Sequence, residues 1–323
     1  MKLYILLATY NGDAYIDEQI ASICSQTYTN WKLLIRDDGS TDSTVGKIKN
    51  LVLQDERIEL LDDPTGNLGV VANFSKLAEI ALSRNADYIM FCDQDDVWNY
   101  DKIEISLNKL LEAEKKYDKS TPILVHTDLT VVDENRELIS SSFLRFQHLH
   151  HPYTDPVRTL LVHNVVTGST VSMNYALLKL ATPVREGVIM HDWWYALAAA
   201  VYGKLEFIPS ATLSYRQHCT NVEGSVGFYS KLSLSNVNFF GKAKHYSQKL
   251  KCSIRQACAI TKLGDNNSNN NSAISKVHYF CQMGDDSLSV FGRINALQNS
   301  KACPQGIIRR FAFYMLILFI KSV

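Results

Sequence analysis

The 323 residues are 46% hydrophobic and 20% charged, an ordinary globular composition that allows one large domain and an appendage. Seven cysteines are scattered and never spaced CxxC, which argues against a disulfide framework or a structural zinc site and favours a reducing cytoplasm. The N-terminal run MKLYILLATYNG lacks the small-residue cleavage site of a secretory signal, so we expect a buried strand there.

Charge is distributed unevenly along the chain, although 33 basic and 33 acidic residues cancel overall. From Ser225 to Val323, thirteen Lys and Arg accompany three Asp and no Glu, a net charge of +10, and the preceding residues therefore carry −10. This asymmetry predicts an anionic partner for the tail, either nucleic acid or the cytoplasmic face of a membrane. The alternative is a basic helical lobe that docks on an acidic domain.

Apolar runs alternate with helix-like stretches through the first 135 residues. The expected strands are residues 2–9, 32–38, 57–63, 87–93 and 123–133, and the expected helices lie near 14–26, 41–54, 70–83 and 99–117. Strands and helices in alternation form crossover units. The pattern therefore predicts an α/β fold, with a mostly parallel sheet and helices on both of its faces.

Polar motifs follow three of these strands. ATYNG comes after the first strand, DDGS after the second and DQDD after the fourth. Because the carboxyl ends of parallel strands meet at one edge of a sheet, we expect the three motifs to share that edge, where open α/β sheets bind nucleotides. The alternative is that the acidic stretch is a solvated turn.

The second half of the chain is less regular. The apolar segment LVHNVVTGSTVSMN precedes a Trp-rich helix HDWWYALAAAVYG, a strand KLEFIPS and the segment LSYRQH. We place a boundary near residues 221–225, which gives one domain over residues 1–224 and a basic, mainly helical region over residues 225–323. Within that region, residues 226–262 and 274–297 have helical patterns, and the polar linker LGDNNSNNNS separates them.

The C-terminal sequence GIIRRFAFYMLILFIKSV contains ten uninterrupted apolar residues, from Phe311 to Ile320. A helix of this length cannot span a bilayer, which needs about twenty residues. With Arg309 and Arg310 before the run and Lys321 after it, the segment could lie in a membrane interface. It could also be buried in a partner or in its own lobe.

The stretch CDQDDVW gathers three carboxylates in four residues, and they repel one another unless water, a cation or a hydrogen-bond donor lies among them. Asp93 and Asp95 are separated by one residue, so in a tight turn both could bind a hard divalent cation that also takes phosphate oxygens. Mg²⁺ and Mn²⁺ suit oxygen ligands of this kind. DxD alone occurs by chance in many chains, and its place between an apolar strand and a helix strengthens it.

Two further motifs contain carboxylates with a candidate chemical role. In DDGS, Asp38 could accept the ring N–H of uracil or thymine while the glycine lets the backbone pass close to the base, or Asp38 or Ser40 could cap the next helix. In MHDWWY, Asp192 could likewise cap a helix. It could instead act as a general base in a cleft where Trp193 and Trp194 stack on a sugar.

In combination, these segments resemble the inverting family 2 glycosyltransferases, which have the GT-A fold. The opening ATYNGDAYIDEQIASICSQTYTNWKLLIRDDGSTDST is similar to theirs, and CDQDDVW, HNVVTGSTVSMN, HDWW and YRQH follow in the expected order. The similarity covers roughly residues 1–224. DQDDVW together with YRQH is most similar to the bacterial rhamnosyltransferase-type members that build O-antigen or capsule polysaccharide.

The resemblance implies a nucleotide site at the shared edge. Its residues are Thr9, Tyr10, Asn11, Asp37, Asp38 and Asp93. Among them, Asp38, helped by Asp37, would read the pyrimidine, and Asp93 would contact the ribose or the diphosphate.

The resemblance also implies residues for catalysis and metal binding. Asp192 matches the family's catalytic base, Asp95 would bind Mn²⁺ or Mg²⁺, and His218 matches a position that often completes the metal or diphosphate site. Contacts with the donor or the acceptor are expected for five other residues: Asn73, Asn164, Trp193, Trp194 and Arg216. The family often has Glu before the base, whereas this chain has His191, so no role is carried over to that neighbour.

The sequence therefore predicts a metal-dependent inverting glycosyltransferase. Its expected donor is a dTDP- or UDP-sugar, with L-rhamnose as a candidate, and its expected acceptor is a lipid-linked saccharide at the cytoplasmic face of the inner membrane. We expect no nucleic-acid partner, because the tail lacks interleaved aromatic and basic residues. There are three alternatives: a nucleotidyltransferase, a nucleotide-sugar hydrolase, and a non-catalytic scaffold subunit that binds a membrane or nucleic acid. The nucleotidyltransferases usually have an early Gly-rich loop with a basic residue, and the segment ATYNGDAY lacks these features.

Overall fold

The computed structural model describes residues 1–218, 239–264, 271–285 and 287–319, and it contains two compact units. Unit 1 comprises Met1–Phe143, Val166–Val184 and Leu205–Ser225. Unit 2 comprises Leu144–Val165, Arg185–Lys204 and Val226–Val323. Each unit is therefore assembled from three separate segments of the chain. The domain boundary expected near residues 221–225 lies outside the described residues.

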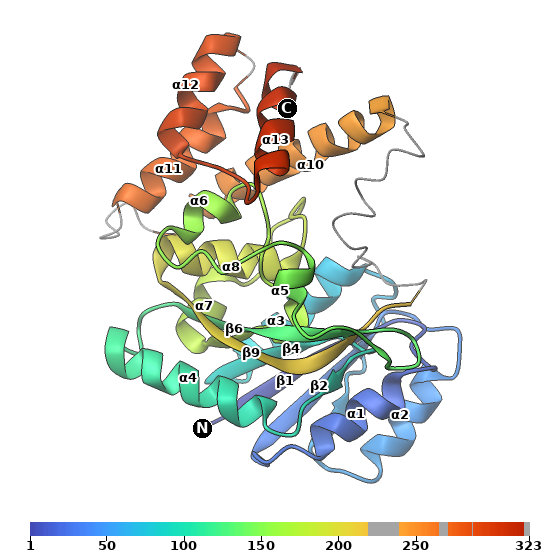
Figure 1. The fold of residues 1–323 in the computed structure, drawn as a ribbon. Helices are drawn as coiled ribbons and strands as arrows, with labels where there is room; N and C mark the ends of the chain where they lie inside the picture. Colours follow the sequence, from blue (N-terminus) through green and yellow to red (C-terminus); the bar gives the residue numbers. More distant parts are fainter. Residues whose placement is uncertain (219–238, 265–270, 286, 320–323) are drawn as a thin grey trace. The chain divides into compact units, whose positions relative to one another are not determined.

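Unit 1 is built on a nine-stranded sheet (Figure 1). In chain order the strands are β1 (Leu3–Thr9), β2 (Trp31–Asp37), β3 (Ile58–Leu60), β4 (Tyr88–Cys92), β5 (Val97–Trp98), β6 (Ile123–Val132), β7 (Leu138–Ser140), β8 (Ser172–Asn174) and β9 (Lys204–Arg216). Their order across the sheet is β3-β2-β1-β4-β8-β6-β9-β5, and β7 pairs with β6.

One half of the sheet is parallel, as the sequence predicts. β1 pairs in parallel with both β2 and β4, and β3 continues the parallel order beside β2. The other half is mixed, because β8 is antiparallel to β4 and to β6, and β5 is antiparallel to β9. The expected α/β fold is confirmed, with more antiparallel pairing than the alternation of strands and helices predicts.

Helices cover both faces of this sheet. Those of unit 1 are α1 (Ile16–Cys24), α2 (Thr44–Val52), α3 (Val70–Ser83), α4 (Lys102–Tyr117), the short η1 (Gly168–Thr170) and α7 (Tyr175–Ala181). α3 packs against β1, β2 and β4, whereas α4 packs against β6 and β8, and Figure 1 shows α1, α2 and α4 below the sheet and α3 above it. Because the central strands are covered on both sides, all of β4 is buried.

Two elements differ from the sequence prediction. The helix expected over 99–117 begins later, at Lys102, because Val97 and Trp98 pair with β9 to form β5. The segment KLEFIPS and the first four residues of LSYRQH form one long strand, β9, which ends at Arg216. The other boundaries predicted for the first 135 residues lie close to those observed.

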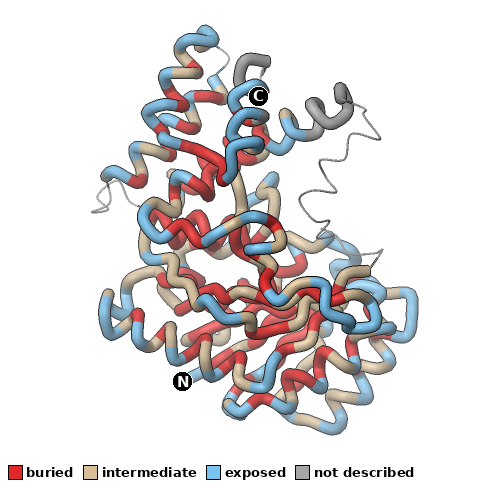
Figure 2. The backbone as a smooth tube through the Cα atoms, in the orientation of Figure 1, coloured by how far each residue is buried: buried red, intermediate tan, exposed pale blue. Residues whose placement is uncertain are grey.

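Unit 2 is helical in its described residues. Its helices are α5 (Phe143–Phe146), which starts at the end of unit 1, α6 (Pro156–Leu160), α8 (His191–Tyr202), α10 (Phe239–Ile260), α11 (Asn271–Gln282), α12 (Val290–Ser300) and α13 (Ile307–Phe319). α8 packs against α6, α10 and α11, so it is buried from His191 to Val201 (Figure 2). The predicted helical region over 226–262 is described only from residue 239 onward.

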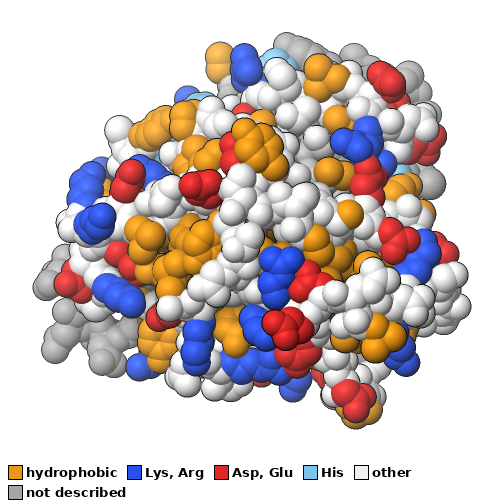
Figure 3. Space-filling model, turned by 90° about the horizontal axis from the view of Figure 1, so that it is seen from below, with side chains coloured by type: hydrophobic (Ala, Val, Ile, Leu, Met, Phe, Trp, Pro, Cys, Tyr) orange, Lys and Arg blue, Asp and Glu red, His pale blue; other side chains and the backbone are white. Residues whose placement is uncertain are grey.

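Two observations concern the expected membrane partner: the charge on one face of the molecule and the length of the helices. On the face shown in Figure 3, basic and acidic side chains are interspersed and do not separate into regions of one sign. None of the helices within the described ranges combines the length and the apolar character that a membrane span requires.

Candidate functional site

Gln94, the middle residue of the DxD motif, joins the loop after β4 to the loop after β1. Its Oε1 atom accepts hydrogen bonds from Thr9 Oγ1 at 2.6 Å and from the Tyr10 amide at 2.9 Å. Its Nε2 atom donates to the Tyr10 carbonyl oxygen at 3.1 Å. One side chain therefore fixes the ATYNG and DQDD motifs against each other.

Gly12 provides the space that Gln94 occupies. A Cβ atom at this position would lie 2.3 Å from Gln94 Oε1, a distance at which the side chain would have to move. The Gly12 amide also donates to Thr44 Oγ1 at 2.8 Å, at the start of α2. A larger residue at this position would therefore displace the Gln94 side chain from its contacts with the ATYNG motif.

Asn11 connects the loop after β1 to the loop after β2. Its amide donates to Ser40 Oγ at 2.8 Å, and its Oδ1 atom accepts from the Thr41 amide at 2.8 Å. Thr9 is buried, whereas the Tyr10 side chain is exposed. Among the three predicted nucleotide-binding residues of this loop, Tyr10 and Asn11 are therefore exposed, and the Asn11 side chain is already bonded to Thr41.

Asp37 shapes the turn of the DDGS motif. Its Oδ2 atom accepts from the Gly39 and Ser40 amides at 3.0 and 2.8 Å. Gly39 has a φ of 89°, a left-handed conformation that glycine adopts without steric cost. Asp37 therefore holds the turn, and its help in reading a pyrimidine stays a prediction.

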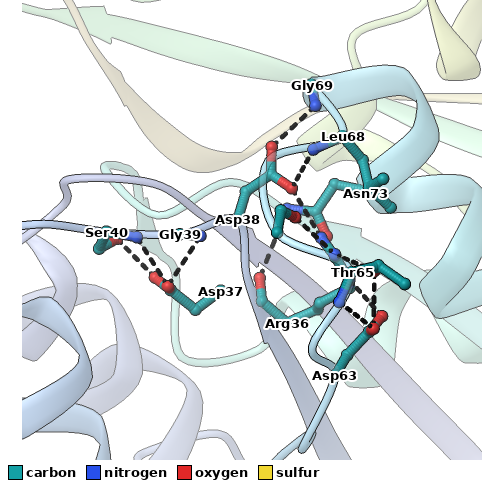
Figure 4. Close-up of polar contacts among 11 residues, drawn as sticks. Arg36, Asp37, Asp38, Gly39, Ser40, Asp63, Thr65, Leu68, Gly69 and Asn73 are labelled. Atoms are coloured by element: carbon teal, nitrogen blue, oxygen red, sulfur yellow. Dashed lines mark hydrogen bonds and ion pairs between the residues drawn. The ribbon is translucent and has the colours of Figure 1, made fainter.

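Asp38 is buried in a network of hydrogen bonds (Figure 4). Its Oδ1 atom accepts from Arg36 at 2.7 Å and from the Leu68 amide at 2.8 Å, and its Oδ2 atom accepts from the Gly69 amide at 2.8 Å. The N-cap residue of α2 is Ser43, and the Asp38 carboxylate is bonded to Arg36, Leu68 and Gly69, so the helix-capping alternative is wrong for Asp38. A carboxylate offers about four acceptor positions, which leaves capacity for one donor from a ligand.

Arg36 holds the loop before α3 beside Asp38, a role that the sequence analysis missed. Its buried guanidinium donates to Asp63 Oδ2 at 2.8 Å, to Thr65 Oγ1 at 2.9 Å and to the Gly66 carbonyl at 3.0 Å. Arg36, followed by Thr65, keeps the pKa of Asp63 well below its ordinary value. The signal in the sequence is a charged residue inside the otherwise apolar strand KLLIRDD.

Asn73 lies behind this network. Its side chain is buried, and its Nδ2 atom donates to the Arg36 carbonyl at 3.4 Å. Its Oδ1 atom has no hydrogen-bond partner among the described residues. A contact between Asn73 and a donor or acceptor therefore stays a prediction.

Asp95 and His218 meet at the same edge of the sheet, although they are far apart in the sequence. Asp95 Oδ2 lies 2.8 Å from His218 Nε2, and the imidazole packs on the ring of Tyr15. Among the described residues, no group of three or more His, Cys, Asp or Glu side chains could hold a metal. A carboxylate and an imidazole nonetheless fit Mn²⁺ or Mg²⁺ when phosphate oxygens complete the coordination. The pair is therefore suited to a cation that protein and diphosphate hold jointly.

Arg216 positions the backbone of the DxD motif. Its Nε atom donates to the Asp95 carbonyl at 3.1 Å and one terminal nitrogen donates to the Glu134 carbonyl at 2.8 Å. The other terminal nitrogen forms an ion pair with Glu18, which also pairs with Arg136. The sequence analysis missed Glu18, because nothing in helix α1 indicates a partner at the far end of β9.

Asp96, the third carboxylate of CDQDDVW, is a further residue that received no role from the sequence. It is buried, and burial followed by the charges of Asp95 and Asp93 raises its pKa well above the ordinary value. Its neutral form is therefore favoured, which limits repulsion within the motif. Nearby, burial lowers the pKa of Lys102 to about 8, and its Nζ atom lies 4.8 Å from the centre of the Trp98 ring.

Asp192 lies in the first turn of α8 in unit 2. Its Oδ1 atom accepts hydrogen bonds from the Trp193 amide and, at 3.1 Å, from Asn164 Nδ2. Two predicted site residues, Asp192 and Asn164, are therefore neighbours within this unit. Burial lowers the pKa of the adjacent His191 to about 3, so that imidazole is neutral at physiological pH.

Trp193 and Trp194 are both buried within unit 2. The Trp193 indole nitrogen donates to the Leu160 carbonyl at 2.6 Å, which satisfies its one polar group inside the unit. Their surroundings are those of packing residues. Stacking on a sugar stays a prediction for both.

The predicted site residues thus fall into two groups. Unit 1 contains Thr9, Tyr10, Asn11, Asp37, Asp38, Asn73, Asp93, Asp95, Arg216 and His218. Unit 2 contains Asn164, Asp192, Trp193 and Trp194. Chemically, the first group can hold a pyrimidine nucleotide and a cation, and the second offers a carboxylate base.

Comparisons with known proteins identify the family to which this chain is similar. The model of Glycosyl transferase family 2 matches residues 4–164. The dTDP-rhamnosyl transferase RfbG of Shigella flexneri is 37% identical over 244 residues, which are 73% of this chain and 81% of RfbG. The UDP-Glc:alpha-D-GlcNAc-diphosphoundecaprenol beta-1,3-glucosyltransferase WfgD of Escherichia coli is 34% identical over 108 residues, 33% of this chain and 40% of WfgD. An uncharacterized glycosyltransferase of Haemophilus influenzae is 38% identical over 109 residues, 33% of this chain and 42% of that relative.

The chain thus matches most of RfbG but less than half of the other two relatives. Among solved structures, S. aureus TarS 1–349 in complex with UDP-GlcNAc aligns with a TM-score of 0.55 and 14% identity, over 93% of this chain and 80% of that one. At this identity the likeness concerns the fold alone. It confirms the expected GT-A fold.

Proposed function

Because the chain belongs to glycosyltransferase family 2, we propose that it moves a sugar from a nucleotide donor to a saccharide acceptor and inverts the anomeric carbon. The observation that carries this proposal is the edge formed by the loops after β1, β2 and β4. Gln94 and Asn11 join these loops, and Asp38 and Asp95 follow two strands that both pair with β1. That edge offers an acceptor for a pyrimidine and ligands for a cation beside its diphosphate.

The donor is a dTDP- or UDP-sugar, and dTDP-L-rhamnose is the first candidate. Two arguments support a pyrimidine: the remaining acceptor capacity of Asp38 and the exposed Tyr10 ring nearby on the same edge. The extensive match to the dTDP-rhamnosyl transferase RfbG supports rhamnose.

Asp95 and His218 would hold Mn²⁺ or Mg²⁺ together with the diphosphate oxygens. When bound, the ion supplies positive charge where negative charge builds on the departing nucleoside diphosphate. Arg216 keeps the Asp95 backbone in place through its hydrogen bond to the carbonyl oxygen.

Asp192 acts as the general base. It removes the proton of the acceptor hydroxyl while that oxygen attacks the anomeric carbon from the face opposite the nucleotide. The Asn164 amide and the Trp193 backbone hold the Asp192 carboxylate in one orientation. A single displacement of the nucleotide by the acceptor oxygen inverts the anomeric centre.

The acceptor is a saccharide on a polyprenyl carrier, and the protein works at the cytoplasmic face of the inner membrane. The similarity to WfgD, whose name gives a diphosphoundecaprenol acceptor, supports a lipid-linked substrate. The net charge of +10 over residues 225–323 supports attraction to anionic lipids. No nucleic acid takes part in this reaction.

A thermal-shift panel of dTDP-, UDP- and GDP-sugars, each with and without Mn²⁺, tests the donor. We expect a pyrimidine nucleotide-sugar with Mn²⁺ to raise the melting temperature most, because a ligand at 100 times its Kd stabilises the native state by ~2.7 kcal/mol. GDP-sugars serve as the control, since a purine does not present the same ring N–H. Equal shifts with all three classes, or none, would contradict the proposed donor. Measuring nucleotide release with and without a saccharide acceptor then separates transfer from hydrolysis.

Replacing Arg216 by Lys tests whether this residue positions the metal site or binds phosphate directly. Lysine keeps the charge but cannot reach Asp95, Glu134 and Glu18 at once, so we expect the Mn²⁺ concentration for half-maximal activity to rise by about tenfold. The matched control is Arg136→Lys, which also faces Glu18. A higher KM for the donor with an unchanged Mn²⁺ titration would instead indicate direct phosphate binding.

A further inference from the structure

Helix α13 presents a stripe of exposed apolar side chains, called the α13 stripe below. Its members are 40–84% exposed: Ile307, Ile308, Phe311, Tyr314 and Met315. Their spacing of i, i+1, i+4, i+7 and i+8 places all five on one face of the helix. A contiguous exposed apolar surface of this kind marks an interaction site more often than a free surface.

The opposite side of α13 is attached to unit 2. Phe313 is buried, and the Arg309 guanidinium donates to the Gln147 carbonyl at 2.7 Å and to the His148 carbonyl at 3.3 Å. Just before the helix, Gln305 exchanges two hydrogen bonds with the backbone of His150, at 2.8 and 2.7 Å. These contacts fix the rotation of α13, so the stripe faces away from the unit's own core.

Charge decides which partner suits the stripe. Lys301 and Arg310 are exposed residues of the same segment, and residues 225–323 carry a net charge of +10. A second copy of the chain would bring one +10 region against another, whereas an anionic lipid surface is complementary to it. The apolar sequence also continues to Ile320 and ends at Lys321, a pattern typical of helices that lie in the interface.

We propose that the α13 stripe inserts into the surface of an anionic bilayer and holds the enzyme there as a peripheral protein. This inference rests on the proposed function, because a lipid-linked acceptor is reached from the membrane surface. The stripe enters the boundary between headgroups and acyl chains, while the neighbouring cations pair with lipid phosphates. The described part of α13 supplies the apolar face, and its attachment through Arg309 gives unit 2 a defined orientation on the lipid.

Vesicle flotation of the full chain tests the proposal. We expect the wild type to float with vesicles that contain phosphatidylglycerol, to float less with phosphatidylcholine alone, and to detach as salt rises. The double variant Ile307→Ser/Phe311→Ser should lower the bound fraction by about tenfold or more, because two apolar side chains lose their burial in lipid. The matched control is Leu53→Ser, an equally exposed apolar residue of unit 1, which should float like the wild type.

Two further measurements, donor binding and transfer to a soluble saccharide acceptor, separate a failure of the membrane proposal from a failure of the proposed function. Both measurements should give wild-type values in the double variant, and this result would also show that the variant folds. Equal flotation of wild type and double variant would overturn the inference. So would a wild-type dimer in light scattering that the double variant loses, with no flotation of either protein. If the wild type floats but transfers no sugar, the result supports the membrane-binding role of the α13 stripe and contradicts the proposed function.

Discussion

Replacing Asp192 by Asn is expected to lower sugar transfer by about 10²–10⁴-fold, the usual contribution of a positioned general base. The amide has nearly the same shape, and its Oδ1 atom can still accept from the Trp193 amide and from Asn164. What it loses is the ability to take a proton from the acceptor hydroxyl. Donor binding should therefore be unchanged, and the loss should appear in kcat. Steady-state kinetics and a donor titration of the same preparation measure the two effects.

Asp155→Asn is the matched control for this variant. Asp155 is another carboxylate of unit 2 at a helix start, where it accepts from the Arg158 amide and pairs with Lys276. Its removal should affect stability and leave transfer near the wild-type rate. Normal turnover of Asp192→Asn would remove Asp192 from the role of base, and normal turnover together with a lowered melting temperature would assign it a structural role at the start of α8.

The parallel part of the fold was predictable because its strands are long and apolar. β1, β2 and β4 are largely buried, so their sequences are mainly hydrophobic runs that differ from the amphipathic helices between them. β8 has only three residues and β5 only two, too few to show a period of their own. Their antiparallel pairing depends on β6 and β9, distant in sequence, and is therefore not visible in the local pattern.

The meeting of the three motifs at one edge of the sheet was also predictable, whereas the contacts that hold them together were not. Once ATYNG, DDGS and DQDD follow parallel strands, topology alone brings them to one edge. The contacts that hold this edge join residues far apart in the chain, such as Gln94 with Tyr10 and Glu18 with Arg216. A single sequence carries no record of such pairs. The exception is Arg36, whose charge inside an apolar strand signals a buried partner.

Replacing Asp95 by Ala is expected to abolish the part of nucleotide-sugar binding that depends on metal. Asp95 contributes the carboxylate of a two-residue platform with His218, and a single remaining imidazole is a poor ligand for Mg²⁺ or Mn²⁺ beside a diphosphate. In the wild type, adding EDTA should weaken donor binding strongly. In the variant, EDTA should change nothing, because no bound metal remains to be removed. Isothermal titration with the donor, with Mn²⁺ and with EDTA, measures both.

Asp17→Ala separates the loss of a ligand from the loss of a charge. Asp17 is an exposed carboxylate of α1 that pairs with Lys47, so its removal changes the net charge of unit 1 by the same amount and leaves the DxD motif in place. This control should keep the wild-type response to Mn²⁺. A Mn²⁺ titration of Asp95→Ala that matches the wild type would exclude Asp95 as a metal ligand. The pairing with His218 would then be structural, and the cation, if one is used, would be held by other oxygens at this edge, with Asp93 as the next carboxylate to replace.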